Sequence, residues 1–169
     1  MKFDPYRTAI LMTSNRIPPQ FVEWIDQLVG ATCCRVDCGV IGSVFYMDFR
    51  KNETEDISLE VINTVWRVES PDKVLATSDD DNSTGGPIVQ ALSGLQSRVV
   101  TTASVGFPSL DLQIKFDNLI NLYLFNLSKT LLGTSRGYTL SKSEITFAAR
   151  QGYDITVEEN GQLGKYKGK

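Results

Sequence analysis

The clearest strand pattern in the chain is Leu110-Asp111-Leu112-Gln113-Ile114-Lys115-Phe116. Four apolar side chains alternate in it with three polar ones, which is typical of a β-strand that buries one face and exposes the other. The alternation therefore points Asp111 away from the core. The same period of two over residues 45–49 and 57–61 predicts two further strands of this kind.

Most of the remaining chain also consists of short apolar segments separated by turn residues. The predicted strands cover residues 8–12, 36–40, 44–49, 57–61, 65–68, 74–76, 98–103, 110–116, 121–125, 138–140, 145–147 and 155–157. Two short helices are predicted over 21–29 and 87–92, because each has proline at its start and glycine after its end. The expected fold is α+β, a predominantly antiparallel β-sheet with two short helices, in one domain over residues 1–169.

The two halves of the chain resemble each other. Leu28-Val29-Gly30 has a counterpart in Leu92-Ser93-Gly94, and Phe45-x-Met47-x-Phe49 has one in Leu112-x-Ile114-x-Phe116. The offset from the glycine to the phenylalanine is longer in the second half, which indicates a short insertion there. We therefore predict a duplicated helix-plus-sheet unit. Its copies are residues 18–77 and 87–141, and residues 78–86 form the seam loop.

The 169 residues include no histidine. This excludes Ser-His-Asp and Cys-His catalysis and every zinc site that uses a histidine ligand. The segment 79–85 is similar to a calcium-binding loop, but Thr84 and Gln90 stand where an EF-hand has glycine and glutamate. We therefore predict that the protein is not an enzyme and has neither a metal site nor a cofactor. A small-ligand or metal-assisted enzyme that works with carboxylates alone remains open as an alternative.

The three cysteines, Cys33, Cys34 and Cys38, form no disulfide framework. They are interpreted as small buried hydrophobic residues. If residues 32–38 form a strand, Cys34 and Cys38 share one face and Cys33 points to the other.

The chain carries 17 basic and 20 acidic residues, a net charge of −3. A nucleic-acid partner is disfavoured because such partners select a basic surface, whereas a mildly acidic protein suits a basic protein partner. The N-terminal residues have no signal-peptide pattern, and no apolar run is long enough to span a membrane. We expect a cytoplasmic location and no membrane partner. The last three lysines, Lys165, Lys167 and Lys169, are interpreted as a solvated tail.

Two blocks of sequence resemble a known group of proteins. The first runs from Leu59 to Val68, contains Val65-Trp66-Arg67-Val68, and continues to Thr77-Ser78-Asp79-Asp80. The second is Ser109 to Asn118, followed by Leu122-Tyr123-Leu124-Phe125. Together, over residues 28–140, they resemble small bacterial proteins, some of which are similar to immunity proteins of contact-dependent growth inhibition and polymorphic toxin systems. The resemblance implies a non-catalytic protein that neutralises a cognate toxin by binding it, and it implies no catalytic residues.

A toxin of this kind is expected to be a basic, nuclease-like domain, so exposed acids in loops and exposed aromatic residues are the candidate contacts. The candidate partner-binding residues are Asp79, Asp80, Asp81, Glu53, Glu55, Asp56 and Tyr46. The alternative is a structural or oligomeric subunit of a larger bacterial complex, for which self-association is expected.

Overall fold

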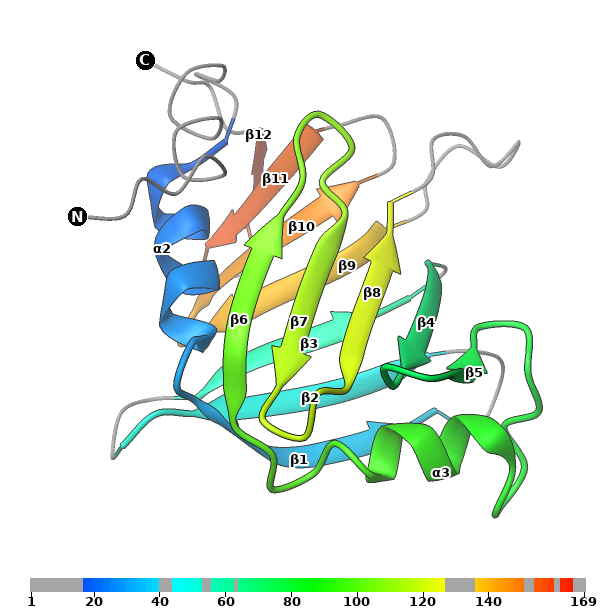
Figure 1. The fold of residues 1–169 in the computed structure, drawn as a ribbon. Coiled ribbons are helices and arrows are strands. Elements are labelled where there is room, and N and C mark those ends of the chain that lie inside the picture. Colours follow the sequence, from blue (N-terminus) through cyan, green and yellow to red (C-terminus); the bar gives the residue numbers. More distant parts are fainter. Residues whose placement is uncertain are drawn as a thin grey trace.

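The computed structural model describes residues 17–39, 44–52, 56–62, 64–126, 136–150, 154–159 and 162–165. Within them the chain forms two antiparallel β-sheets and two short helices (Figure 1), which confirms the predicted fold class. The apolar segment 8–12 lies outside the described residues. No helix in the described part of the chain is long and apolar enough to cross a membrane.

The larger sheet has seven strands in the order β1-β2-β3-β9-β10-β11-β12. Their bounds are Thr32–Cys38, Phe45–Arg50, Ile57–Val61, Arg136–Lys142, Ile145–Arg150, Asp154–Glu159 and Gln162–Lys165. The sequence did not predict the last strand, β12, which places Lys165 in the sheet rather than in a solvated tail. The sequence Gln162-Leu163-Gly164-Lys165 has a single apolar residue and therefore shows no strand pattern.

The smaller sheet has five strands in the order β5-β4-β8-β7-β6. Their bounds are Val74–Thr77, Val65–Glu69, Asn121–Phe125, Leu112–Phe116 and Val100–Val105. Strand β7 begins at Leu112 and not at Leu110, because Leu110 has a positive φ of 60° that does not fit a strand.

The core lies between the two sheets, whose strands run across one another (Figure 1). The rings of Phe45 on β2 and Trp66 on β4 meet edge to face, with centroids 5.2 Å apart. The buried hydroxyl of Tyr138 on β9 donates a hydrogen bond of 2.9 Å to the carbonyl oxygen of Leu110. The first contact joins the two sheets and the second joins β9 to the segment just before β7, and the alternating strands supply the apolar side chains.

Each helix covers part of this core. Helix α2, Pro19–Leu28, lies against β6 and buries Phe21 and Trp24 edge-on against Phe147 of β10. Helix α3, Pro87–Ser93, lies against β1 and β5. Both helices begin with proline, as the sequence predicts, because the first turn needs no N–H from that residue.

The two halves of the chain have the same order of elements. The first half forms α2-β1-β2-β3-β4, and the second forms α3-β6-β7-β8-β9. In each half the fourth strand crosses to the other sheet. The larger sheet therefore contains β1-β2-β3-β9, and the smaller sheet contains β6-β7-β8-β4 in the corresponding order. The two strand orders agree, as a duplication requires, and the duplication remains our interpretation of that agreement.

A β-bulge interrupts the first strand of each half. Cys34 is the additional residue between Cys33, which pairs with Phe49, and Arg35. Thr101 has the same place in β6, after Val100, which pairs with Phe116. The spacing from the bulge to Phe49 in the first half equals the spacing from the bulge to Phe116 in the second. The insertion expected in the second half therefore lies before its first strand, β6.

The bulge also makes the predicted cysteine orientation wrong. Cys33 is buried in the core and Cys38 packs against the core from the same side of β1. Cys34 instead contacts the carbonyl oxygen of Asp48 on β2 and the carboxylate of Asp56, just before β3. An additional residue in one strand reverses the alternation that follows it. All three cysteines are free thiols.

Candidate functional site

The outer face of the seven-stranded sheet carries a groove of about 500 Å³. It lies over β1, β2, β3 and β9. Its lining residues are Arg35, Asp37, Cys38, Tyr46, Asp48, Ser58, Leu59, Glu60, Thr139 and Ser141. Strands β2 and β3 alternate regularly, so their apolar residues enter the core and their polar residues reach this face.

Cross-strand pairing arranges the polar lining residues in two rows. The first row runs through Asp37, Tyr46, Glu60 and Thr139. The second row lies two residues away from the first on each strand and runs through Arg35, Asp48, Ser58 and Ser141. Residues opposite one another in adjacent strands are close enough for their side chains to interact.

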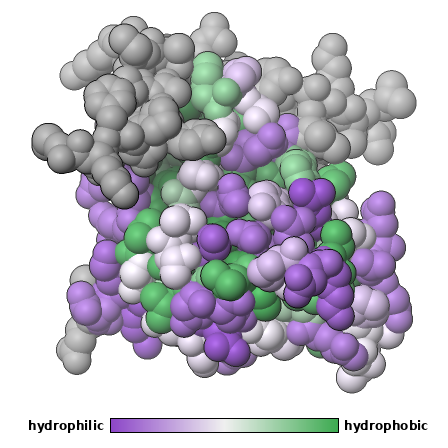
Figure 2. Space-filling model, viewed as in Figure 1, coloured by the Kyte–Doolittle hydropathy of each residue, from purple (hydrophilic) through white to green (hydrophobic). Residues whose placement is uncertain are grey.

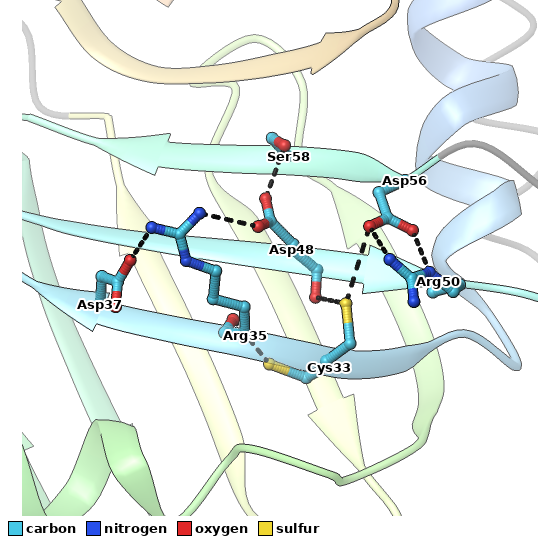
Figure 3. A network of polar contacts seen from close by, with 8 residues as sticks. Cys33, Arg35, Asp37, Asp48, Arg50, Asp56 and Ser58 are labelled. Carbon is cyan, nitrogen blue, oxygen red and sulfur yellow. Dashed lines mark hydrogen bonds and ion pairs between the residues drawn. The ribbon is translucent and has the colours of Figure 1, made fainter.

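The second row contains the cation of the groove, Arg35. Its guanidinium forms an ion pair with Asp37 and lies 3.7 Å from Asp48 Oδ2 (Figure 3). Asp48 also accepts a hydrogen bond of 2.6 Å from the hydroxyl of Ser58. One guanidinium is therefore shared by two carboxylates.

Glu60 is the third carboxylate of the groove, and it is held by hydroxyl groups. Thr139 Oγ1 donates to Glu60 Oε2 over 3.4 Å, and the phenol of Tyr46 is hydrogen-bonded to the same side chain. This bond stabilises the neutral phenol and raises the pKa of Tyr46. Among the described residues Glu60 forms no ion pair. The groove thus has more negative charge than its own guanidinium balances.

An ion pair lies beside the groove on the same face. Arg50 donates two hydrogen bonds of 2.6 Å to the carboxylate of Asp56 (Figure 3), which lowers the pKa of that carboxyl. Cys34 Sγ contacts the same carboxylate at 3.9 Å. Burial, and then the charge of Asp56, raise the pKa of the Cys34 thiol, so the thiol stays protonated and is a weak nucleophile at neutral pH.

Two of the predicted contact residues lie on this face. Tyr46 lines the groove with 42% of its surface exposed, and Asp56 lies beside the groove in its pair with Arg50. Glu53 and Glu55 lie outside the described residues.

The other predicted contacts lie elsewhere, in the loop between β5 and α3. Asp80 accepts hydrogen bonds from the backbone and side chain of Thr77, and Asp81 accepts from the backbone and hydroxyl of Ser83. Asp79 is exposed at the same turn. Two of these three carboxylates shape the loop itself, and the loop follows an edge strand of the other sheet.

The remaining groove residues were missed by the search for loop acids and exposed aromatic residues. Alternation in 45–49 and 57–61 places Asp48, Ser58 and Glu60 on the same outward face as Tyr46, and this signal could have found them. The contribution of Thr139 and Ser141 depends on the pairing of β9 with β3, which no local pattern shows.

In the described ranges no group of three or more cysteine, aspartate and glutamate side chains is placed to hold a metal ion. The chain matches no protein-family model, no curated protein and no solved structure.

Proposed function

We propose that the protein is a cytoplasmic, non-catalytic immunity protein that binds and neutralises a cognate bacterial toxin. The proposal places the contact on the outer face of the seven-stranded sheet, at the groove. It rests on the resemblance of residues 28–140 to small bacterial proteins, some of which are similar to immunity proteins, and on the charge of this face.

The observation that carries the proposal is the charge of the groove. Asp37, Asp48 and Glu60 line it together with one guanidinium, that of Arg35. A basic, nuclease-like toxin domain has the opposite charge, and complementary potentials accelerate association and select the partner. Tyr46 is exposed and lies in the row of Asp37 and Glu60. Tyrosine is a residue type that often supplies much of the binding free energy at protein interfaces.

The test is co-expression of the tagged protein with the product of the gene immediately upstream. We expect the upstream protein to stop bacterial growth when expressed alone, and growth to resume when this protein is present. A complex of fixed stoichiometry should then be purified through the tag. These two results together identify an immunity protein.

Two variants make the test specific to the groove. Glu60→Lys reverses a groove charge and is expected to abolish rescue, whereas Asp79→Lys in the loop between β5 and α3 is expected to preserve it. Absence of rescue by the unaltered protein contradicts the proposal. If the protein then associates with itself, an oligomeric subunit becomes the better account.

A further inference from the structure

The outer face of the five-stranded sheet repeats the layout of the groove with different side chains. There the row across β4, β8, β7 and β6 runs through Arg67, Tyr123, Gln113 and Ser104. In the order of elements it corresponds to the row through Thr139, Glu60, Tyr46 and Asp37. Because the strand orders agree, each position of the groove has a counterpart on the other face.

On the five-stranded sheet the counterpart of Thr139 is an arginine of the protein itself, Arg67. The guanidinium carbon of Arg67 lies 5.0 Å from the ring centre of Tyr123 and 5.4 Å from that of Phe125. Its Nε lies 3.0 Å from a carboxylate oxygen of Glu69. The arrangement combines an arginine, aromatic rings and a carboxylate on a face where polar and apolar residues are intermixed (Figure 2).

On the seven-stranded sheet the counterpart of Arg67 is Thr139, a much smaller residue. Thr139 is 3% exposed and contributes to the floor of the groove. A carboxylate, Glu60, and an exposed phenol, Tyr46, are still present in the same row. Glu60 stands at the position of Tyr123 and Tyr46 at that of Gln113, so this row offers an arginine a carboxylate and a phenol, in an arrangement different from the one around Arg67.

We infer that the groove binds an arginine side chain of the partner protein, in the place that Arg67 occupies on the opposite sheet. The inference rests on the proposed function for the identity of the partner, and on the two corresponding rows for the site. A guanidinium can donate two parallel hydrogen bonds to one carboxylate, here Glu60, and can stack on a phenol ring, here Tyr46. An ammonium group offers neither the planar fork nor the flat face.

The experiment is a titration of the isotope-labelled full chain, followed by NMR, with Nα-acetyl-arginine amide. Nα-acetyl-citrulline amide, which has the same shape without the charge, and Nα-acetyl-lysine amide are the matched probes. We expect saturable shifts of the backbone amides of Tyr46, Glu60 and Thr139 with the arginine probe, weaker shifts with lysine and none with citrulline. Equal shifts with all three probes, or arginine shifts confined to other residues, overturn the inference.

Two variants and one control complete the test. Glu60→Gln removes a charged acceptor and should weaken binding of the arginine probe at least about tenfold. Thr139→Arg should fill the groove as Arg67 fills the opposite face, and should abolish binding. Glu69→Gln makes the same chemical change on the five-stranded sheet and should leave binding of the probe unchanged. If Thr139→Arg does not fold, Glu60→Gln alone decides.

The probe titration needs no toxin, so the two proposals can fail separately. Saturable arginine binding without any toxin complex overturns the proposed function and supports the inference. A toxin complex that forms equally well with Glu60→Gln, together with an inert arginine probe, overturns the inference and leaves the proposed function standing.

Discussion

Gly137 lies where the two segments that cross between the sheets come together. Its carbonyl oxygen accepts a hydrogen bond from the hydroxyl of Thr64, just before β4. A Cβ atom at this position would lie 2.6 Å from Asn126 Oδ1 and 2.9 Å from the carbonyl oxygen of Ala149. Asn126 is itself fixed, because its side-chain nitrogen donates to the carbonyl oxygen of Ser109 over 3.0 Å. There is therefore no room for a side chain.

Gly137→Ala is expected to lower the free energy of unfolding by about 1–3 kcal/mol, the usual cost of overpacking a site that cannot relax. Urea denaturation followed by circular dichroism measures this change. Gly106→Ala is the matched control, because its Cβ would meet nothing nearer than 3.7 Å. Equal stability of the two variants would contradict the crowding described at Gly137.

Asp56 gives a prediction of pH dependence. Its hydrogen bonds with Arg50 lower the pKa of the carboxyl in the folded state. The resulting stability is therefore fully present above the ordinary pKa of an aspartate, about 3.9, and is lost as the pH falls through the lowered value. In Asp56→Asn, unfolding free energies measured between about pH 5 and pH 2 should fall less steeply than in the unaltered protein. An unchanged slope would show that the pair with Arg50 does not persist in solution.

At the scale of single elements, alternation predicted most strands because one face of each enters the core. It failed where the backbone departs from a regular strand. The positive φ of Leu110 shortens β7 at its start, and the bulge at Cys34 reverses the orientation of the residues that follow. Neither feature has a signal in the apolar pattern, since Leu110 remains buried and Cys34 is an ordinary strand residue.

The prediction for a single element concerns the packing of helix α2. Its spacing of apolar residues was readable from the sequence, and its buried face holds Trp24 4.8 Å from Phe147 between ring centroids. Trp24→Ala is expected to cost about 3–5 kcal/mol of stability. Gln20→Ala, at an exposed position of the same helix, should cost less than about 0.5 kcal/mol. Similar midpoints of thermal unfolding for the two variants would contradict the packing of α2 against β10.

At the scale of the whole molecule, the exchange of fourth strands makes the two halves interdependent. Strand β4 pairs with β8, and β9 pairs with β3. The sequence indicated two similar halves, but it contained no sign of which strands pair across them. One side of the groove follows from that exchange, because β9 supplies Thr139 and Ser141. A prediction from charge and expected exposure alone therefore selected the loop acids, rather than residues of the sheet face, as the partner contacts.

The exchange predicts the behaviour of a chain divided in the loop before α3. Fragments 1–84 and 85–169 should each be largely unfolded alone, because each lacks the strand that completes its own sheet. Mixed in equal amounts, they should recover the β-sheet signal in circular dichroism and elute as one species. A fragment that unfolds cooperatively by itself would contradict this interdependence.

The two outer faces differ in a way that matters for recognition. One is hollowed and has three carboxylates to one guanidinium, and the other carries its own arginine on aromatic rings. The association rate constant of the complex between the protein and its toxin, measured at low and high salt, tests most directly which face is used. Asp48→Asn with Glu60→Gln should slow association about tenfold or more at low salt and weaken its salt dependence, while Asp79→Asn should change neither. Slower association of the Asp79 variant with an unchanged groove variant would contradict the assignment of the partner to the seven-stranded sheet.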